Sequence, residues 1–264
     1  MKEKSYLVVA ATAALLFTLS SLTAKQPSKP PRGGTDILHW NIRKEMTNEG
    51  AVSNATAFVS AKQNQQGNAN NQRLDLTIRR LETNSTYRLF AVLDDDTNFV
   101  HASDFTTDAK GNATLRYMKV GSSNGKGLGK GKSPLPADLD PISHIRELAV
   151  GNVHTQAVFT ADLSAPDKLQ YLIKRKFTAG GVTSQLRLKA TTRQVQFRLY
   201  TWGLAPGTNY WLAVNDAVVA GGNSETNGNL SFLSLPVNAA DILDVHKLAI
   251  WDGTSNSVIS TLLP

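Results

Sequence analysis

Short segments in which apolar and polar residues alternate follow one another along most of this chain. Clear examples are LDLTI (74–78), QLRLKA (185–190) and VQFRLYT (195–201), with Gly, Asn, Asp and Pro between such segments. A period of two is typical of strands with one buried face. Beyond residue 35 no segment has the apolar period of a long helix, and we expect only a helical turn or two near 137–143 and 239–244. The pattern predicts an all-β fold of antiparallel β-sandwiches or partly closed barrels.

The chain also repeats itself. The segment DILHWNIRKEMTNEG (36–50) aligns with DKLQYLIKRKFTAGG (167–181) and matches Trp40 with Tyr171. Residues 74–91 align with 197–214, and residues 148–163 align with 248–263. The offset falls from one match to the next because the first copy has extra residues around 63–72 and at 121–133, which we expect in surface loops. We therefore predict two tandem, duplicated β-sandwich domains, residues 36–165 and 167–264.

Residues 1–24 have the pattern of a secretory signal peptide. A head with two lysines precedes an apolar run from Tyr6 to Leu19, and small or polar residues continue to Ala24. An uncleaved anchor is the alternative, but the run is shorter than the roughly 20 residues that a spanning helix needs. Residues 25–35 are rich in Pro, Gly and Lys and predict a flexible linker. Because the chain has no cysteine for lipid attachment or disulfides, we expect a secreted or periplasmic bacterial protein that does not span a membrane after cleavage.

The segment GLAPGTNYWLAV (203–214) has a leucine, a Pro-Gly turn and a tyrosine that enters a strand. It resembles the tyrosine corner of fibronectin type III domains, which are immunoglobulin-like sandwiches. The resemblance implies an Ig-like or fibronectin III-like architecture, in which Tyr210 and its counterpart Tyr87 bury their rings while their hydroxyls reach the backbone. The first copy has Thr83-Asn84 in place of the Pro-Gly turn, and several strands follow Tyr210 where the family has few. No function is implied, since such folds host many functions.

The formal net charge is +7, and the insertion GSSNGKGLGKGKS (121–133) adds to a group of lysines without a nearby acid. We expect weak contacts with polyanions, or simply a solvated loop. We predict no specific nucleic-acid recognition. The same stretch contains G-x-S-x-G and the end of a phosphate-binding loop, yet its Gly/Lys alternation cannot form the helix that either motif requires. The candidate polyanion contacts are Lys119, Lys126, Lys130 and Lys132.

Metal, cofactor and catalytic chemistry find little support in the sequence. The five histidines lack paired ligand spacing, and no cysteine is present. The acidic stretches 94–96 and 138–140 lack the glycine and distal glutamate of a calcium loop. No Ser/His/Asp set can be brought together from the sequence. We therefore expect no metal site, no cofactor and no enzymatic activity.

Aromatic residues occur in the second copy where the first copy has polar ones. Tyr200, Trp202 and Trp211 fall on the strand faces opposite the predicted core positions, and the first copy has Thr77, Arg79 and Arg88 there. An exposed aromatic patch would bind carbohydrate or a protein partner, while the alternative is that it packs against the other copy or a loop. We therefore expect an exported, non-enzymatic protein for binding or adhesion. A structural scaffold without a ligand site is the first alternative, and a secreted hydrolase is the least favoured. The sequence does not determine the oligomeric state.

Overall fold

The computed structural model describes residues 36–50, 52–94, 98–121, 131–152, 157–239, 241–253 and 256–263. The described part is all-β, as predicted, and has no α-helix. The strands of the first half are β1 (Ile37–Glu45), β2 (Thr47–Asn48), β3 (Thr56–Gln66), β4 (Ala69–Arg79), β5 (Thr86–Leu93), β6 (Val100–Thr106), β7 (Ala113–Lys119), β8 (Ser133–Pro134), β9 (Ile145–Asn152) and β10 (Ala157–Asp162). Those of the second half are β11 (Lys168–Ala179), β12 (Val182–Thr191), β13 (Val195–Trp202), β14 (Asn209–Val214), β15 (Ala217–Asn223), β16 (Leu230–Phe232), β17 (Lys247–Trp251) and β18 (Ser257–Leu262).

The expected helical turns are present as short 3₁₀ helices. They are η1 (Ala137–Leu139), η2 (Ile142–His144) and η3 (Ile242–Asp244). η2 and η3 lie just before β9 and β17 of the small sheets, and η1 precedes η2. Each turn buries one apolar side chain, namely Leu139, Ile142 or Ile242. The turns therefore help to close the space between the layers.

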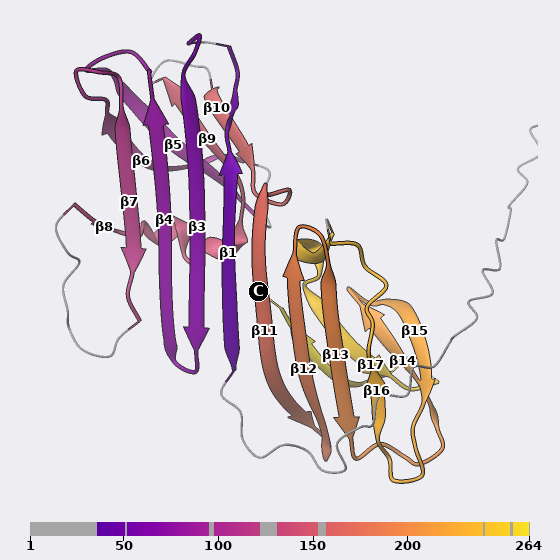
Figure 1. Cartoon of the computed structure of the whole chain (residues 1–264). Helices are drawn as coiled ribbons and strands as arrows, with labels where there is room; N and C mark the ends of the chain where they lie inside the picture. The colour runs from indigo at the N-terminus through magenta and orange to yellow at the C-terminus, as the bar shows by residue number, and fades with distance from the viewer. Residues whose placement is uncertain are drawn as a thin grey trace, which may run out of the picture.

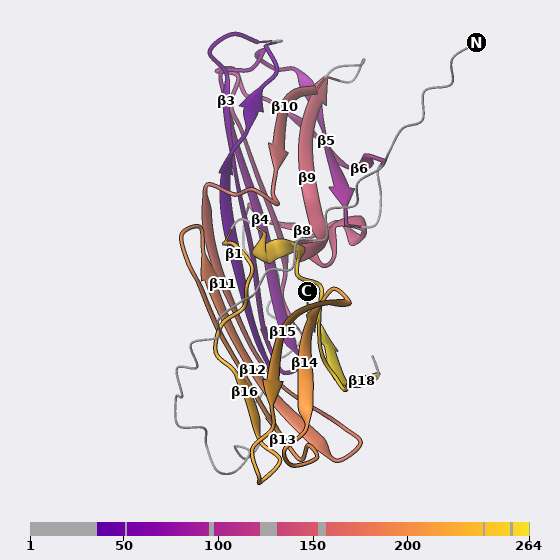
Figure 2. The same cartoon turned by 90° about the vertical axis from the view of Figure 1, so that its right-hand side faces the viewer.

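The strands form one large sheet and two small ones (Figure 1). The large sheet has nine strands in the order β16-β13-β12-β11-β1-β3-β4-β7-β8. The small sheets have the orders β2-β10-β9-β5-β6 and β15-β14-β17-β18, and each is built from one half of the chain. Both small sheets lie on the same side of the large sheet (Figure 2). The other side of the large sheet is consequently not covered by either of them.

The two halves meet at a seam between β1 and β11, which pair antiparallel. Matching elements follow this seam outward in the same sequence on both sides, β1-β3-β4-β7 on one side and β11-β12-β13-β16 on the other. At the seam Trp40 lies opposite Tyr171, the residue with which it aligns in the sequence repeat. A local twofold axis perpendicular to the sheet therefore relates the halves, as in a symmetric dimer joined into one chain.

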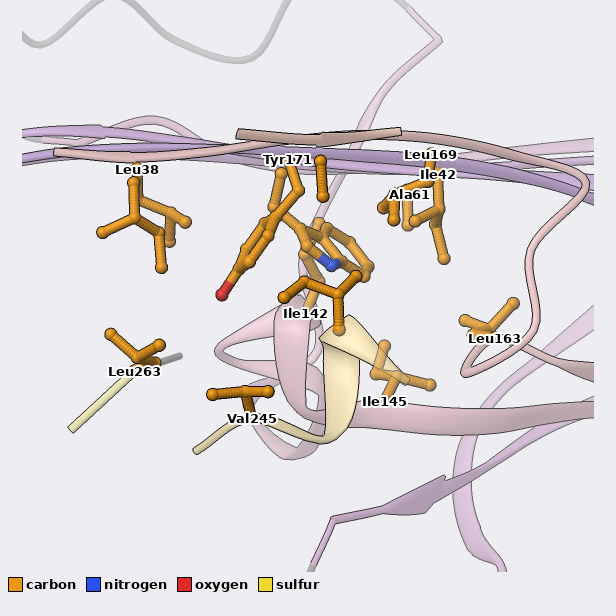
Figure 3. Packing of buried hydrophobic residues seen from close by; sticks show 14 of the residues in the cluster. Leu38, Ile42, Ala61, Ile142, Ile145, Leu163, Leu169, Tyr171, Val245 and Leu263 are labelled. Atoms are coloured by element: carbon orange, nitrogen blue, oxygen red, sulfur yellow. The ribbon is translucent and has the colours of Figure 1, made fainter. Parts of the chain in front are cut away.

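This shared sheet differs from the expected picture of two tandem sandwiches linked by a short joint. Each half alone would leave an unpaired edge strand, β1 or β11, with a row of free N–H and C=O groups. Pairing the two edges satisfies those groups. The core is also continuous beneath the seam, where Ile42 and Ile142 of the first half lie close to Tyr171 and Val245 of the second (Figure 3).

The tyrosine corners occur in both halves as predicted. Tyr87 and Tyr210 are buried, and each hydroxyl accepts a hydrogen bond from a backbone N–H five residues upstream. The donor is Ala205 at 3.1 Å for Tyr210 and Glu82 at 3.4 Å for Tyr87. The contact is longer in the first half, where Thr83-Asn84 replaces the Pro-Gly turn.

The expectation of a surface-loop insertion around residues 63–72 is wrong, because these residues lengthen the β3–β4 hairpin instead. Polar side chains are tolerated in these strands because some of them form hydrogen bonds with other parts of the chain. Gln72 is buried, donates to the Asp140 carboxylate at 2.5 Å and accepts from the N–H of Ile142 at 2.7 Å. The extra hairpin length therefore supports the segment that carries η1 and η2.

Candidate functional site

The three aromatic candidates do not form one patch. Tyr200 and Trp202 lie on β13, on the side of the large sheet that faces away from the small sheets, and Trp211 lies on the outward face of a small sheet. Because the inner faces of the two sheets pack together, these outward faces point in opposite directions. Trp202 is only 5% exposed and contacts the half-buried Tyr200, with ring centroids 6.2 Å apart. Trp211 is 41% exposed.

Trp211 has a second tryptophan beside it, which the sequence comparison did not single out. In the register of β14 and β17, Trp211 lies directly opposite the half-buried Trp251. Cross-strand neighbours of this kind have Cβ atoms about 4.5–5.5 Å apart. Trp211 and Trp251 are thus cross-strand neighbours on the outward face of the sheet β15-β14-β17-β18, and they are here called the tryptophan pair.

A glycine on the neighbouring strand gives Trp211 its position. Gly221 on β15 lies opposite Trp211, and a Cβ placed there would be 2.5 Å from the indole Cζ3 and 2.7 Å from Cε3. Only the absence of a side chain lets the ring lie against the β15 backbone at this point. The Cζ3–Cε3 side of the indole is thus held near the strand, and the exposed part of the ring is left for a ligand to contact.

The corresponding surface of the first half has different chemistry. Arg88 occupies the position of Trp211, and its Nε lies 3.4 Å from the Asp104 carboxylate. The same carboxylate lies 2.8 Å from His101 Nε2. Gly151 aligns with Trp251 in the sequence repeat. The first half thus carries an ion-paired polar cluster where the second half carries the tryptophan pair.

The lysine candidates are only partly described. Lys126 and Lys130 lie outside the described residues, and Lys132 is exposed. Lys119 forms an ion pair and hydrogen bond with Asp140, which Gln72 also contacts. Burial acts to raise the pKa of Asp140, but the hydrogen bonds from Lys119 and Gln72 and the lysine charge outweigh it, and the pKa lies below its usual range. Lys119 is therefore partly neutralised and holds the segment before η2.

The described ranges contain no group of three or more His, Cys, Asp or Glu side chains placed to hold a metal ion. The serines of the G-x-S-x-G pattern, Ser122 and Ser123, lie outside the ranges that the structure describes. Among the residues with described positions, no helix is long and apolar enough to cross a membrane.

Comparison of the chain with known proteins found no matching family model, no matching curated protein and no matching solved structure.

Proposed function

We propose that this chain is an exported, non-enzymatic binding protein of the cell envelope or extracellular space. It is built from a duplicated Ig-like or fibronectin III-like sandwich unit, and its ligand is a carbohydrate that stacks on the Trp211–Trp251 pair. The secretory pattern of residues 1–24 and the lack of cysteine support export. The tyrosine corners and the twofold relation at the seam support a duplicated sandwich unit.

The observation that carries the proposal is the exposed indole of Trp211 beside Trp251, held over Gly221. An exposed tryptophan costs solubility without contributing to the core, so its position indicates contact with a partner. A ring that lies along a strand offers a flat apolar surface of the size of one sugar ring. A protein partner would favour a wider apolar surface with a protruding anchor.

A glycan-array screen of four purified proteins tests the proposal. They are the wild type, Trp211→Ala, Trp251→Ala and the control Trp202→Ala. We expect the first two variants to lose glycan binding while keeping the wild-type melting temperature, because neither side chain is fully buried. Trp202→Ala removes a buried indole and should lower stability by about 3–5 kcal/mol, with glycan binding retained at temperatures where the protein stays folded.

The structural-scaffold alternative makes the opposite prediction. If no glycan binds the wild type, and acrylamide quenches Trp211 no better than the buried Trp202, the tryptophan pair is shielded in the working protein. That result would favour a scaffold in which the shared sheet serves only to hold the two halves rigidly together.

A further inference from the structure

The uncovered side of the large sheet carries a concentration of positive charge. On β11, β12 and β13 every second residue faces away from the core. Within these three fully described strands, the outward positions include six basic residues and no acidic one, namely Lys168, Lys174, Lys176, Arg187, Lys189 and Arg198. Neither small sheet covers this side (Figure 2). A large share of the net positive charge of the chain is thus gathered on one open surface.

Three of these cations lie in a row across neighbouring strands. Lys174 is directly opposite Arg187, and Arg187 is directly opposite Arg198. Like charges at such positions repel and destabilise a sheet. No described carboxylate forms an ion pair with any of the three. Folding alone therefore gains nothing from this row, here called the cation row.

The first half shows that the fold does not need the cation row. The twofold relation at the seam places Arg43, Ser60 and Asp75 at the equivalent positions on β1, β3 and β4. There a single cation is followed by a hydroxyl and a carboxylate. Asp75 forms an ion pair with Arg73, whose Nε lies 2.6 Å from Asp75 Oδ2. The same strand positions thus carry a balanced set in one half and three cations in the other. A local conflict of this kind, present in one copy only, points to a ligand.

The surroundings of the row favour a ligand that carries several negative charges. A hollow of about 420 Å³ includes Arg187, Lys189 and Arg198 in its lining, together with the segment Leu233–Leu235. Arginine binds carboxylates through two parallel hydrogen bonds, so two arginines and two lysines can hold several acid groups at once. Adjacent strands are about 4.8 Å apart, which is close to the length of one sugar unit in a linear polysaccharide. The row can therefore meet one carboxylate per sugar.

The shape of the surface argues against a lipid bilayer as the occupant. Strands in a sheet rotate by about 20° relative to their neighbours, so a nine-stranded sheet presents a twisted surface. A planar membrane would contact only part of it, whereas a flexible chain can follow the twist. Nucleic acid has suitable charge, but an exported protein meets polysaccharides, and this step rests on the proposed function.

We infer that the cation row of Lys174, Arg187 and Arg198 binds a linear carboxylated polysaccharide. The site is separate from the tryptophan pair, because the two lie on outward faces that point in opposite directions. The acidic sugars extend across the strands β11, β12 and β13, with their carboxylates on the row and in the adjoining hollow.

Fluorescence anisotropy of labelled oligogalacturonate, titrated with the full chain at about 50 mM salt, tests the inference. The double variant Arg187→Ser/Arg198→Asp installs the residues that the first half uses at the same positions, so it is compatible with the fold. The control Lys110→Ser/Arg80→Asp changes the net charge equally at exposed positions between strands of the first half, away from the row. We expect the row variant to bind about tenfold or more weakly and the control to bind like the wild type.

Other outcomes would overturn the inference. Equal loss in both variants would mean that net charge alone attracts the polymer, and loss in the control alone would place binding near Arg80 and Lys110 in the first half. Binding of a reduced, uncharged oligomer with the same affinity would exclude the carboxylates as the recognised groups. Tighter binding of duplex DNA or of phosphatidylglycerol vesicles would assign the row to nucleic acid or membrane. The Trp211→Ala variant should bind oligogalacturonate normally, which separates this test from that of the proposed function.

Discussion

The seam predicts that the two halves unfold together. Six large side chains are buried along β1 and β11, namely Leu38, Trp40, Ile42, Leu169, Tyr171 and Ile173. Full burial of such a side chain stabilises a protein by about 1.5–3 kcal/mol, so if one third of this burial depends on the seam, the coupling is about 3–6 kcal/mol. A domain of about 100 residues has a total stability of about 5–15 kcal/mol. Neither half should therefore remain folded at denaturant concentrations that unfold the other.

The tryptophans allow a direct measurement. In a Trp40→Phe background the three remaining tryptophans all lie in the second half, so their fluorescence reports on that half, while circular dichroism reports on both. Leu74→Ala then weakens only the first half, where Leu74 is fully buried on β4, by about 3 kcal/mol. With a urea dependence of about 3 kcal/mol per molar, both signals should shift together by about 1 M.

The result that would refute this reasoning is a split transition. If the fluorescence midpoint stays at its value in the background protein while circular dichroism shows an earlier, separate step, the halves unfold independently. Leu248→Ala, which removes a buried side chain from the second half, is the matched control. If the two halves are coupled, it should shift the fluorescence and circular dichroism midpoints together, as Leu74→Ala does.

Three further predictions concern single residues. Tyr210→Phe should lower the free energy of unfolding by about 1 kcal/mol and Tyr87→Phe by less, because the hydroxyl contacts are 3.1 Å and 3.4 Å; urea titration showing the reverse order would contradict this. Gly228→Ala should cost about 2 kcal/mol or more, since its Cβ would lie 2.2 Å from a carbonyl oxygen, whereas Gly180→Ala, with open space around it, should cost about 1 kcal/mol when melting curves are compared. Folding lowers the pKa of Asp140, so its carboxylate stabilises the protein above its ordinary pKa, and this stabilisation is lost as the pH falls through the lower folded value. Asp140→Asn should therefore destabilise the protein at pH 7. A loss of stability that persists unchanged at about pH 2 would refute this pH dependence.

The features that follow from local sequence were predictable. Alternation of apolar and polar residues identified the strands, and the turn before Tyr210 identified the corner, because both depend on residues close together in the chain. The helical turns before β9 and β17 were found for the same reason. The repeat was visible because both copies kept their core positions.

The features that depend on strand pairing were not predictable. Trp251 becomes part of the candidate site only through its register with Trp211, and a single sequence does not specify which strands are neighbours. The buried Trp202 shows the same limit, since alternation assigns it to the outward face but does not reveal that its own side chain is buried at the end of β13. Residues 63–72 were misread as a loop because their Asn and Gln composition is typical of turns, while Gln72 is stabilised by partners about 70 residues away.

The differences between the copies connect the fold with the proposed function. The seam and the tyrosine corners are kept in both halves, and these are the parts that stabilise the shared sheet. Trp211 and the cation row occur in the second half alone, on surfaces that the sheet does not need for folding. Because the seam couples the unfolding of the two halves, the stability of the whole sheet offsets the destabilising effect of an exposed indole and of repelling cations in the second half. Replacing the cation row by the residues of the first half should therefore raise the melting temperature at low salt, and this gain should disappear at high salt, where the repulsion is screened.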